Sequence, residues 1–143
     1  MRKLALVTPL ALTLAGCGTL ARNVDIDIDP HRNQQCVNFY AYTAIPVAIL
    51  GSPEIDVRQI DLASVELLVP QVGGRGTADA MTARYEYLNT DAYEDLLLQI
   101  PLVRDSFRTY MGPAMLTATL YDGTAIKGTE TVCVAGQRGR GYP

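Results

Sequence analysis

The chain has 143 residues, of which 48% are hydrophobic and 19% are charged, and its formal net charge is −3. This length suits a single domain, and the composition is too apolar for an intrinsically disordered protein. The acidic balance argues against a dedicated nucleic-acid-binding protein. One histidine and no tryptophan leave little basis for a histidine-based metal site or an aromatic stacking platform.

The first residues combine two positive charges, an apolar run and a short segment of small residues that ends in cysteine. Arg2 and Lys3 precede an apolar run over residues 4–14, and Leu14-Ala15-Gly16-Cys17 follows. Positive charges, an apolar core of about ten residues and small residues before a cut are typical of a secretory signal peptide. The run is too short to span a bilayer, which takes about 20 apolar residues. Leu-Ala-Gly-Cys resembles a bacterial lipobox, and an ordinary signal peptide that contains a cysteine is the alternative.

The resemblance implies cleavage before Cys17 and a triacylated cysteine, so we expect a lipid membrane as the first partner. Each buried methylene contributes about 0.8 kcal/mol, and stable anchoring takes more than one acyl chain. In the Gram-negative sorting rule, aspartate after the cysteine favours the inner membrane. Here Gly18 stands there, so we expect the outer membrane, with the periplasmic or surface face left open. A second, unidentified envelope protein is the other expected partner.

These features divide the chain into four parts. Residues 1–16 form the signal peptide, 17–23 a lipidated tether, 24–135 the folded domain, and 136–143 a flexible basic tail. Loss of two positive charges with the signal changes the net charge to −5 (−3 − 2).

Two cysteines remain in the mature chain, Cys36 and Cys133. An even pair outside the cytoplasm predicts a disulfide. It would close a loop of 98 residues (133 − 36 + 1), for which loop entropy predicts about 4–5 kcal/mol of stabilisation. Two reduced, buried thiols are the alternative.

The mature chain is dominated by short strand patterns. From residue 24, apolar positions alternate with Asp25, Asp27 and Asp29, which predicts a strand with one solvated face rather than a metal cluster. Residues 71–80 contain three glycines without apolar periodicity and predict a loop. Residues 102–111 allow one helical turn. Asp122-Gly123 predicts a hairpin with a type I′ turn. Strands are predicted over residues 24–29, 36–42, 45–50, 56–60, 64–69, 81–88, 96–100 and 114–121, from 124 onward, and over 131–134.

About eight short strands with frequent turn signals and no long amphipathic helix predict an all-β fold, an antiparallel β-sandwich. Several segments resemble a β-sandwich module of secreted bacterial and archaeal proteins, over roughly residues 24–135. The matching segments are Ile26-Asp27-Ile28-Asp29-Pro30, Ile45-Pro46-Val47-Ala48-Ile49-Leu50-Gly51, Ile55-Asp56-Val57, Ile60-Asp61 and Asp122-Gly123-Thr124. The resemblance implies an Ig-like module outside the cytoplasm, sometimes with a calcium loop, and no reaction.

That module's calcium loop reads D-x-N-x-D-G-x-x-D-L. Laid on it, this chain offers Asn89, Asp91 and Asp95, but Tyr87 replaces the first aspartate and Ala92 the glycine. The first change removes a charged ligand, and the second removes the residue best suited to a sharp turn. The sequence therefore favours a degenerate loop kept as a turn. Calcium binding through Asn89, Asp91 and Asp95 remains the alternative, and no other cofactor is expected.

Catalysis has little support in the sequence. His31 is the single histidine, and none of Ser52, Ser64 and Ser106 lies in a strand-turn-helix nucleophile motif. We therefore expect a non-catalytic structural or interaction module, with a calcium-stabilised surface binding module and a small envelope hydrolase using His31 as alternatives. The last candidate group is aromatic: Tyr85, Tyr87, Tyr93 and Tyr121 are either half-buried strand residues or an exposed patch.

Overall fold

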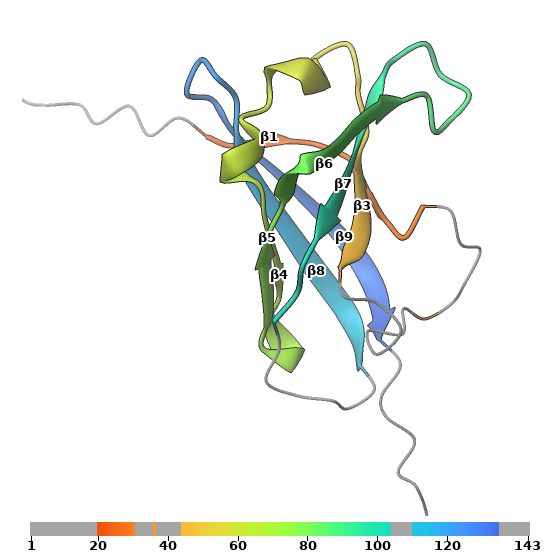
Figure 1. Ribbon diagram of the computed structural model, residues 1–143, viewed down its shortest axis with the longest axis vertical. Helices are drawn as coiled ribbons and strands as arrows, with labels where there is room; N and C mark the ends of the chain where they lie inside the picture. Colours follow the sequence, from red (N-terminus) through yellow and green to blue (C-terminus); the bar gives the residue numbers. More distant parts are fainter. Residues whose placement is uncertain (1–19, 31–35, 37–43, 104–109, 135–143) are drawn as a thin grey trace, which may run out of the picture.

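The structure is a computed structural model that describes residues 20–30, 36, 44–103 and 110–134. Within these residues the chain folds into two β-sheets packed face to face (Figure 1). A core of aliphatic side chains lies between them. The prediction of an all-β sandwich is confirmed. The predicted signal peptide, Cys17, His31, Ser106, most of the strand predicted over 36–42 and the basic tail lie outside the described residues.

Nine strands make up the two sheets. The larger sheet has the order β1-β9-β8-β4-β5 and the smaller the order β2-β3-β7-β6. All neighbours are antiparallel except β1 and β9, which are parallel. The strands are β1 (Arg22–Asn23), β2 (Ile26–Ile28), β3 (Ile45–Ile49), β4 (Glu66–Val69), β5 (Gly74–Thr77), β6 (Asp79–Glu86), β7 (Asp95–Ile100), β8 (Tyr110–Thr119) and β9 (Ala125–Val134).

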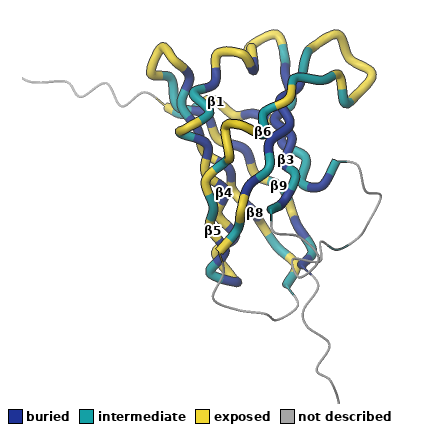
Figure 2. The backbone as a smooth tube through the Cα atoms, viewed as in Figure 1, coloured by how far each residue is buried: buried dark blue, intermediate teal, exposed yellow. Residues whose placement is uncertain are grey.

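Burial follows the sequence pattern closely. In β8 the small and aliphatic residues Ala114, Leu116 and Ala118 are buried, whereas Met115 and Thr117 between them are exposed, as expected for a sheet with one face on the core. The central strands β3 and β7 are buried along most of their length, which explains their nearly continuous apolar runs. Figure 2 shows this buried interior and the exposed connections around it.

The strand predicted over residues 24–29 is shorter in the structure, where it is β2 (Ile26–Ile28), and a separate strand, β1, precedes it. Arg22 and Asn23 pair with β9, so the sheet begins two residues before the predicted boundary at residue 24, and β2 pairs with β3. The predicted solvated face holds for Asp25, which is exposed. It is wrong for Asp29, which is buried and has a φ of 61° where β2 ends.

The strand predicted over residues 56–60 is wrong. The chain instead forms two short 3₁₀-helices, η1 (Val57–Gln59) and η2 (Leu62–Ser64). Each starts at an aspartate, because Asp56 accepts a hydrogen bond from the Arg58 N–H and Asp61 accepts one from the Ala63 N–H. Such local side-chain bonds compete with strand pairing.

The loop predicted over residues 71–80 is also wrong. It contains the 3₁₀-helix η3 (Pro70–Val72), β5 and the start of β6. A Cβ atom at Gly76 would collide with the Pro101 carbonyl oxygen. Glycine in a strand often marks such a close backbone approach, so these glycines permit packing.

The type I′ turn between β8 and β9 is wrong in detail. Gly123 has a φ of 87°, whereas Asp122 is not in the left-handed region, and type I′ requires positive φ at both central residues. The Gly123 N–H donates to the Leu120 carbonyl, and the Leu120 N–H donates to Thr124. The result is a three-residue loop with glycine at its left-handed position. No helical turn occurs at residues 102–103, where Val103 bridges to Arg75.

Glu130 of β9 caps the open edge of β2. Its carboxylate accepts a hydrogen bond from the Ile28 N–H at 2.6 Å across the gap between the sheets. Partial burial raises the pKa of Glu130, the Asp27 charge raises it further, and the Ile28 N–H lowers it in part. The ionised form is therefore disfavoured by folding.

This raised pKa gives a testable pH dependence. Between the pKa of Glu130 in the unfolded chain and its higher pKa in the folded domain, the folded state binds more protons, so stability decreases as pH rises. Glu130→Gln keeps an acceptor for Ile28 and removes the charge. We expect urea denaturation from pH 4 to 7 to show a smaller loss of stability with rising pH for the variant than for the wild type. Identical pH profiles would contradict this assignment.

Candidate functional site

Three connections and the start of the described chain gather at one end of the sandwich, called the loop end. It comprises the turn over residues 50–56 with η1, the β6–β7 loop over residues 87–94, the β8–β9 hairpin over residues 120–124, and residues 20–22, which lead into β1 (Figure 1). Figure 2 shows that most of these loops are exposed. Hydrogen bonds and one ion pair connect these segments to one another.

Asp95 connects two of these loops from the inside. It is fully buried at the start of β7. One carboxylate oxygen accepts from the Gly51 N–H at 2.9 Å, and the other accepts from the Leu88 N–H at 2.8 Å. Buried backbone N–H groups need such partners, so Asp95 fixes the end of β3 and the start of the β6–β7 loop together.

Gly51 makes this arrangement possible. A Cβ atom at this position would collide with the Glu94 carbonyl oxygen, next to Asp95. The last residue of the apolar segment Ile45-Pro46-Val47-Ala48-Ile49-Leu50-Gly51 therefore has a packing reason to be glycine, because the β6–β7 loop lies directly against it.

A salt bridge joins η1 to the same loop from the outside. The Arg58 guanidinium donates two hydrogen bonds to Glu94, at 2.6 and 2.8 Å, and its carbon centre lies 4.3 Å from the centre of the Tyr85 ring. The hydrogen bond to Glu94 raises the pKa of Arg58 further above its already basic value. Paired and stacked geometry of this kind orients a guanidinium, so Arg58 holds the loop in place.

The hairpin and the N-terminal strand complete the loop end. The Tyr121 N–H donates to the Gln59 carbonyl at 2.8 Å, and Arg22 donates to the Glu54 carbonyl at 3.4 Å. Hydrogen bonds from Thr124 lower the pKa of Asp122, and the nearby Arg22 charge lowers it further.

The structure places two of the predicted calcium residues, Asn89 and Asp91, in the β6–β7 loop and the third, Asp95, at the start of β7. Asn89 accepts from the Asp91 N–H, and Asp91 accepts from the Tyr93 N–H, so both close local turns at the exposed surface. Asp95 points inward to Gly51 and Leu88. In the part of the chain that the structure describes, no three His, Cys, Asp or Glu residues are grouped so that they could hold a metal ion.

We therefore expect calcium to leave the stability of the domain unchanged. Both Asp95 oxygens already accept backbone hydrogen bonds, which an incoming ion would disturb. Thermal melts in calcium chloride and in EDTA should give the same midpoint, since a ligand that binds the folded state raises the midpoint once its concentration exceeds its Kd. A higher midpoint in calcium would reinstate the calcium loop.

The disulfide lies away from the loop end. Cys36 and Cys133 are joined, as predicted, and their Cα atoms are 4.3 Å apart. Cys133 stands near the end of β9, opposite Met111 at the start of β8. The bond therefore attaches the connection between β2 and β3 to the last strand.

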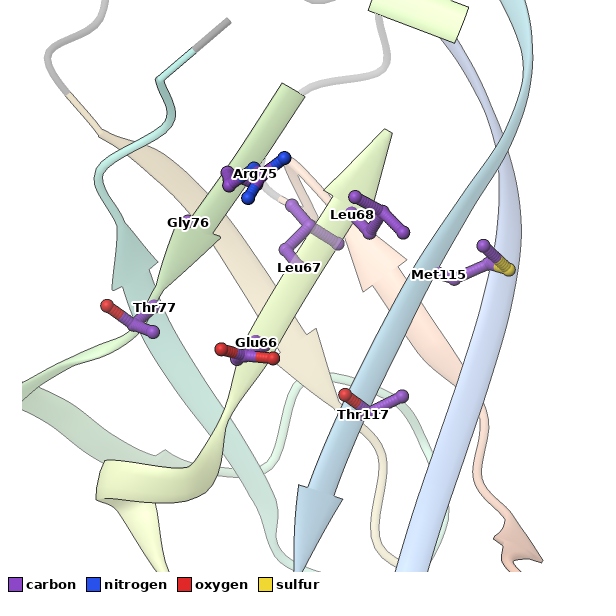
Figure 3. A pocket seen from close by; sticks show the side chains of 8 residues that line it. All are labelled: Glu66, Leu67, Leu68, Arg75, Gly76, Thr77, Met115 and Thr117. Carbon is purple, nitrogen blue, oxygen red and sulfur yellow. The ribbon is translucent and has the colours of Figure 1, made fainter. Parts of the chain in front are cut away.

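A groove of about 370 Å³ lies on the outer face of the larger sheet. Leu68 of β4 lies in register with Met115 of β8 on one side and with Arg75 of β5 on the other. The apolar side chains of Leu68 and Met115 therefore lie beside the positive charge of Arg75 (Figure 3). The eight described residues that line it are Glu66, Leu67, Leu68, Arg75, Gly76, Thr77, Met115 and Thr117. Its lining combines the apolar side chains of Leu68 and Met115 with the charged side chains of Glu66 and Arg75.

Two predicted serines are described, and both have structural roles. Ser52 is hydrogen-bonded to Glu54 within its turn. Ser64 donates to the Asp61 carbonyl and accepts from the Thr119 N–H, which attaches η2 to β8.

Comparison with known proteins adds no relative. No family model matches the chain, and the searches of curated proteins and of solved structures found no match. Among the described residues, no helix is long and apolar enough to cross a membrane.

Proposed function

We propose that this protein is an extracytoplasmic lipoprotein, anchored through acylated Cys17 to the outer membrane, and that its sandwich is a non-catalytic structural or interaction module. The observation that carries the proposal is the position of the lipobox. Cys17 lies five residues before Arg22, the first residue of the first described strand of the sandwich. A signal that ends so close to the domain leaves only a short tether.

The disulfide supports a location outside the cytoplasm. Disulfides persist in oxidising compartments and are rare in cytosolic proteins. The Cys36–Cys133 bond leaves Cys17 as the cysteine for acylation, because the chain has three cysteines. Anchor and disulfide thus account for every thiol.

We further propose that the module is Ig-like. The smaller sheet, β2-β3-β7-β6, matches the order A-B-E-D when the strands from β2 onward are lettered A, B, C, C′, D, E, F and G. The remaining strands give G-F-C-C′ in the larger sheet. The chain departs from antibody domains in having no tryptophan and in the place of its disulfide, which joins the connection after β2 to β9.

Cell fractionation tests the proposal. We expect wild-type protein in the membrane fraction of a Gram-negative host. Globomycin, which blocks cleavage of lipidated precursors, should cause a larger precursor to accumulate. The Cys17→Ala variant should lose the lipid. Membrane fractionation and mass that are unchanged in Cys17→Ala would overturn the proposal, and Ser52→Ala serves as a matched control outside the signal.

A further inference from the structure

The two ends of the described chain lie at opposite ends of the sandwich. Arg22 pairs with Ile126 at the start of β9, whereas Val134 is the last residue of that strand, and Figure 1 shows the two positions well separated. β9 has ten residues, which corresponds to about 30 Å at roughly 3.3 Å per residue. The loop end is therefore the end from which the N-terminal chain leaves.

The distance from the loop end to Cys17 is limited by covalent geometry. An extended chain spans at most about 3.3–3.6 Å per residue. Arg22 is five positions after Cys17, so the anchor lies within about 18 Å of β1. Because this reach is shorter than the sandwich, the far end lies beyond the reach of the tether.

The loop end exposes large apolar and aromatic side chains. Leu20 is 91% exposed, Tyr121 in the hairpin is 66% exposed, and Tyr87 in the β6–β7 loop is 67% exposed. Tyr93 in the same loop is also exposed. Tyrosine is enriched where one end of a side chain meets apolar lipid and the other meets water.

The charges at the loop end are mainly negative. The exposed carboxylates there are Glu54, Asp56, Asp91 and Asp122. Arg58 is paired with Glu94, so Arg22 is the described cation that remains to offset them. Negative charge of this kind is repelled by anionic lipid headgroups.

We infer that the loop end rests on the membrane surface, with Tyr121, Tyr87 and Leu20 in contact with zwitterionic lipid headgroups. This inference rests on the proposed function, because the anchor at Cys17 holds the loop end near the bilayer. The far end, with Met111, faces away from the membrane. The contact is aromatic and aliphatic, and the surrounding carboxylates weaken it on anionic lipid.

Single-tryptophan variants of the lipidated protein test this orientation, since the chain contains no tryptophan of its own. Tyr121→Trp reports on the loop end. Met111→Trp is the matched control, because Met111 is 71% exposed, close to the 66% of Tyr121, and lies at the other end of β8. Both variants are reconstituted into phosphatidylcholine vesicles that carry bromine on the upper acyl chain, and tryptophan quenching is measured.

We expect strong quenching and a blue shift for Tyr121→Trp and neither for Met111→Trp. On vesicles with one third phosphatidylglycerol at low salt, quenching of Tyr121→Trp should decrease and should recover when salt is added, because salt screens the carboxylates. Equal quenching of the two variants would overturn the inference. Equal quenching of Tyr121→Trp on both vesicle types would overturn its choice of zwitterionic lipid.

Co-sedimentation with the vesicles separates this inference from the proposed function. If the protein does not co-sediment, the lipid anchor itself is wrong. If it co-sediments and Tyr121→Trp is not quenched more than Met111→Trp, the anchor stands and the orientation is wrong.

Discussion

Replacing both disulfide cysteines, as Cys36→Ser with Cys133→Ser, should lower the free energy of unfolding by about 4–5 kcal/mol, because the bond constrains a very long loop in the unfolded chain. The residues are 97 positions apart. The bond also attaches the connection between β2 and β3 to the last strand. A domain of ordinary stability has only about 5–15 kcal/mol in total, so the doubly substituted variant should be close to unfolded at 37 °C.

Urea denaturation with and without dithiothreitol measures this effect. The reductant should bring the wild type to the midpoint of the doubly substituted variant and should leave that variant unchanged. A wild-type midpoint that does not respond to the reductant, under conditions in which free thiols appear, would contradict the expected role of the bond.

The second large effect is expected at Asp95. Asp95→Ala removes both acceptors from the N–H groups of Gly51 and Leu88, in a fully buried position. A hydrogen bond to a charged group contributes about 1.5–3 kcal/mol, so we expect a loss of about 3–5 kcal/mol for the two together.

Asp91→Ala is the matched control for Asp95→Ala. It lies in the same loop and accepts one local, exposed hydrogen bond from Tyr93, so its effect should be much smaller. The difference between the two variants should be the same in EDTA as in calcium, if Asp95 acts by hydrogen bonding. Equal effects of the two substitutions would show that burial of Asp95 contributes little.

Most of the sandwich could be predicted from the sequence because its strands alternate or are continuously apolar. The predictions for β3, β7 and β8 depend on the contrast between core and solvent faces, which is local information. The failures have two causes, one local and one distant in the sequence. At Asp56 and Asp61 a side-chain bond two residues along the chain replaces strand pairing, and at Gly76 the neighbour that requires glycine is Pro101, 25 positions away (101 − 76).

The candidate site could be predicted only in part. The resemblance to a calcium loop singles out Asp95. Its hydrogen-bond partner Gly51 lies 44 positions away in the sequence, and this distant partner explains why Asp95 is buried. Arg58 and Glu94 are 36 positions apart, so no spacing rule pairs them. For the tyrosines, the sequence offers an exposed patch as one of two alternatives. That Tyr87, Tyr93 and Tyr121 share one end with the N-terminal strand depends on the fold.

The negative charge and the cysteines have defined positions in the structure. The negative charge of the chain includes four exposed carboxylates at the loop end, beside β1. Two of the three cysteines form one bond, which lies toward the far end of β9. Under the proposed function, the lipid anchor and the disulfide lie at different ends of one small sandwich.

The most direct test of this account is the intact mass of the protein extracted from membranes with detergent. The account predicts the mass of residues 17–143 with one disulfide, increased by a diacylglycerol group and a third acyl chain on Cys17, and loss of that increase in Cys17→Ala. An unmodified mass, or lipid that persists in Cys17→Ala, would contradict it.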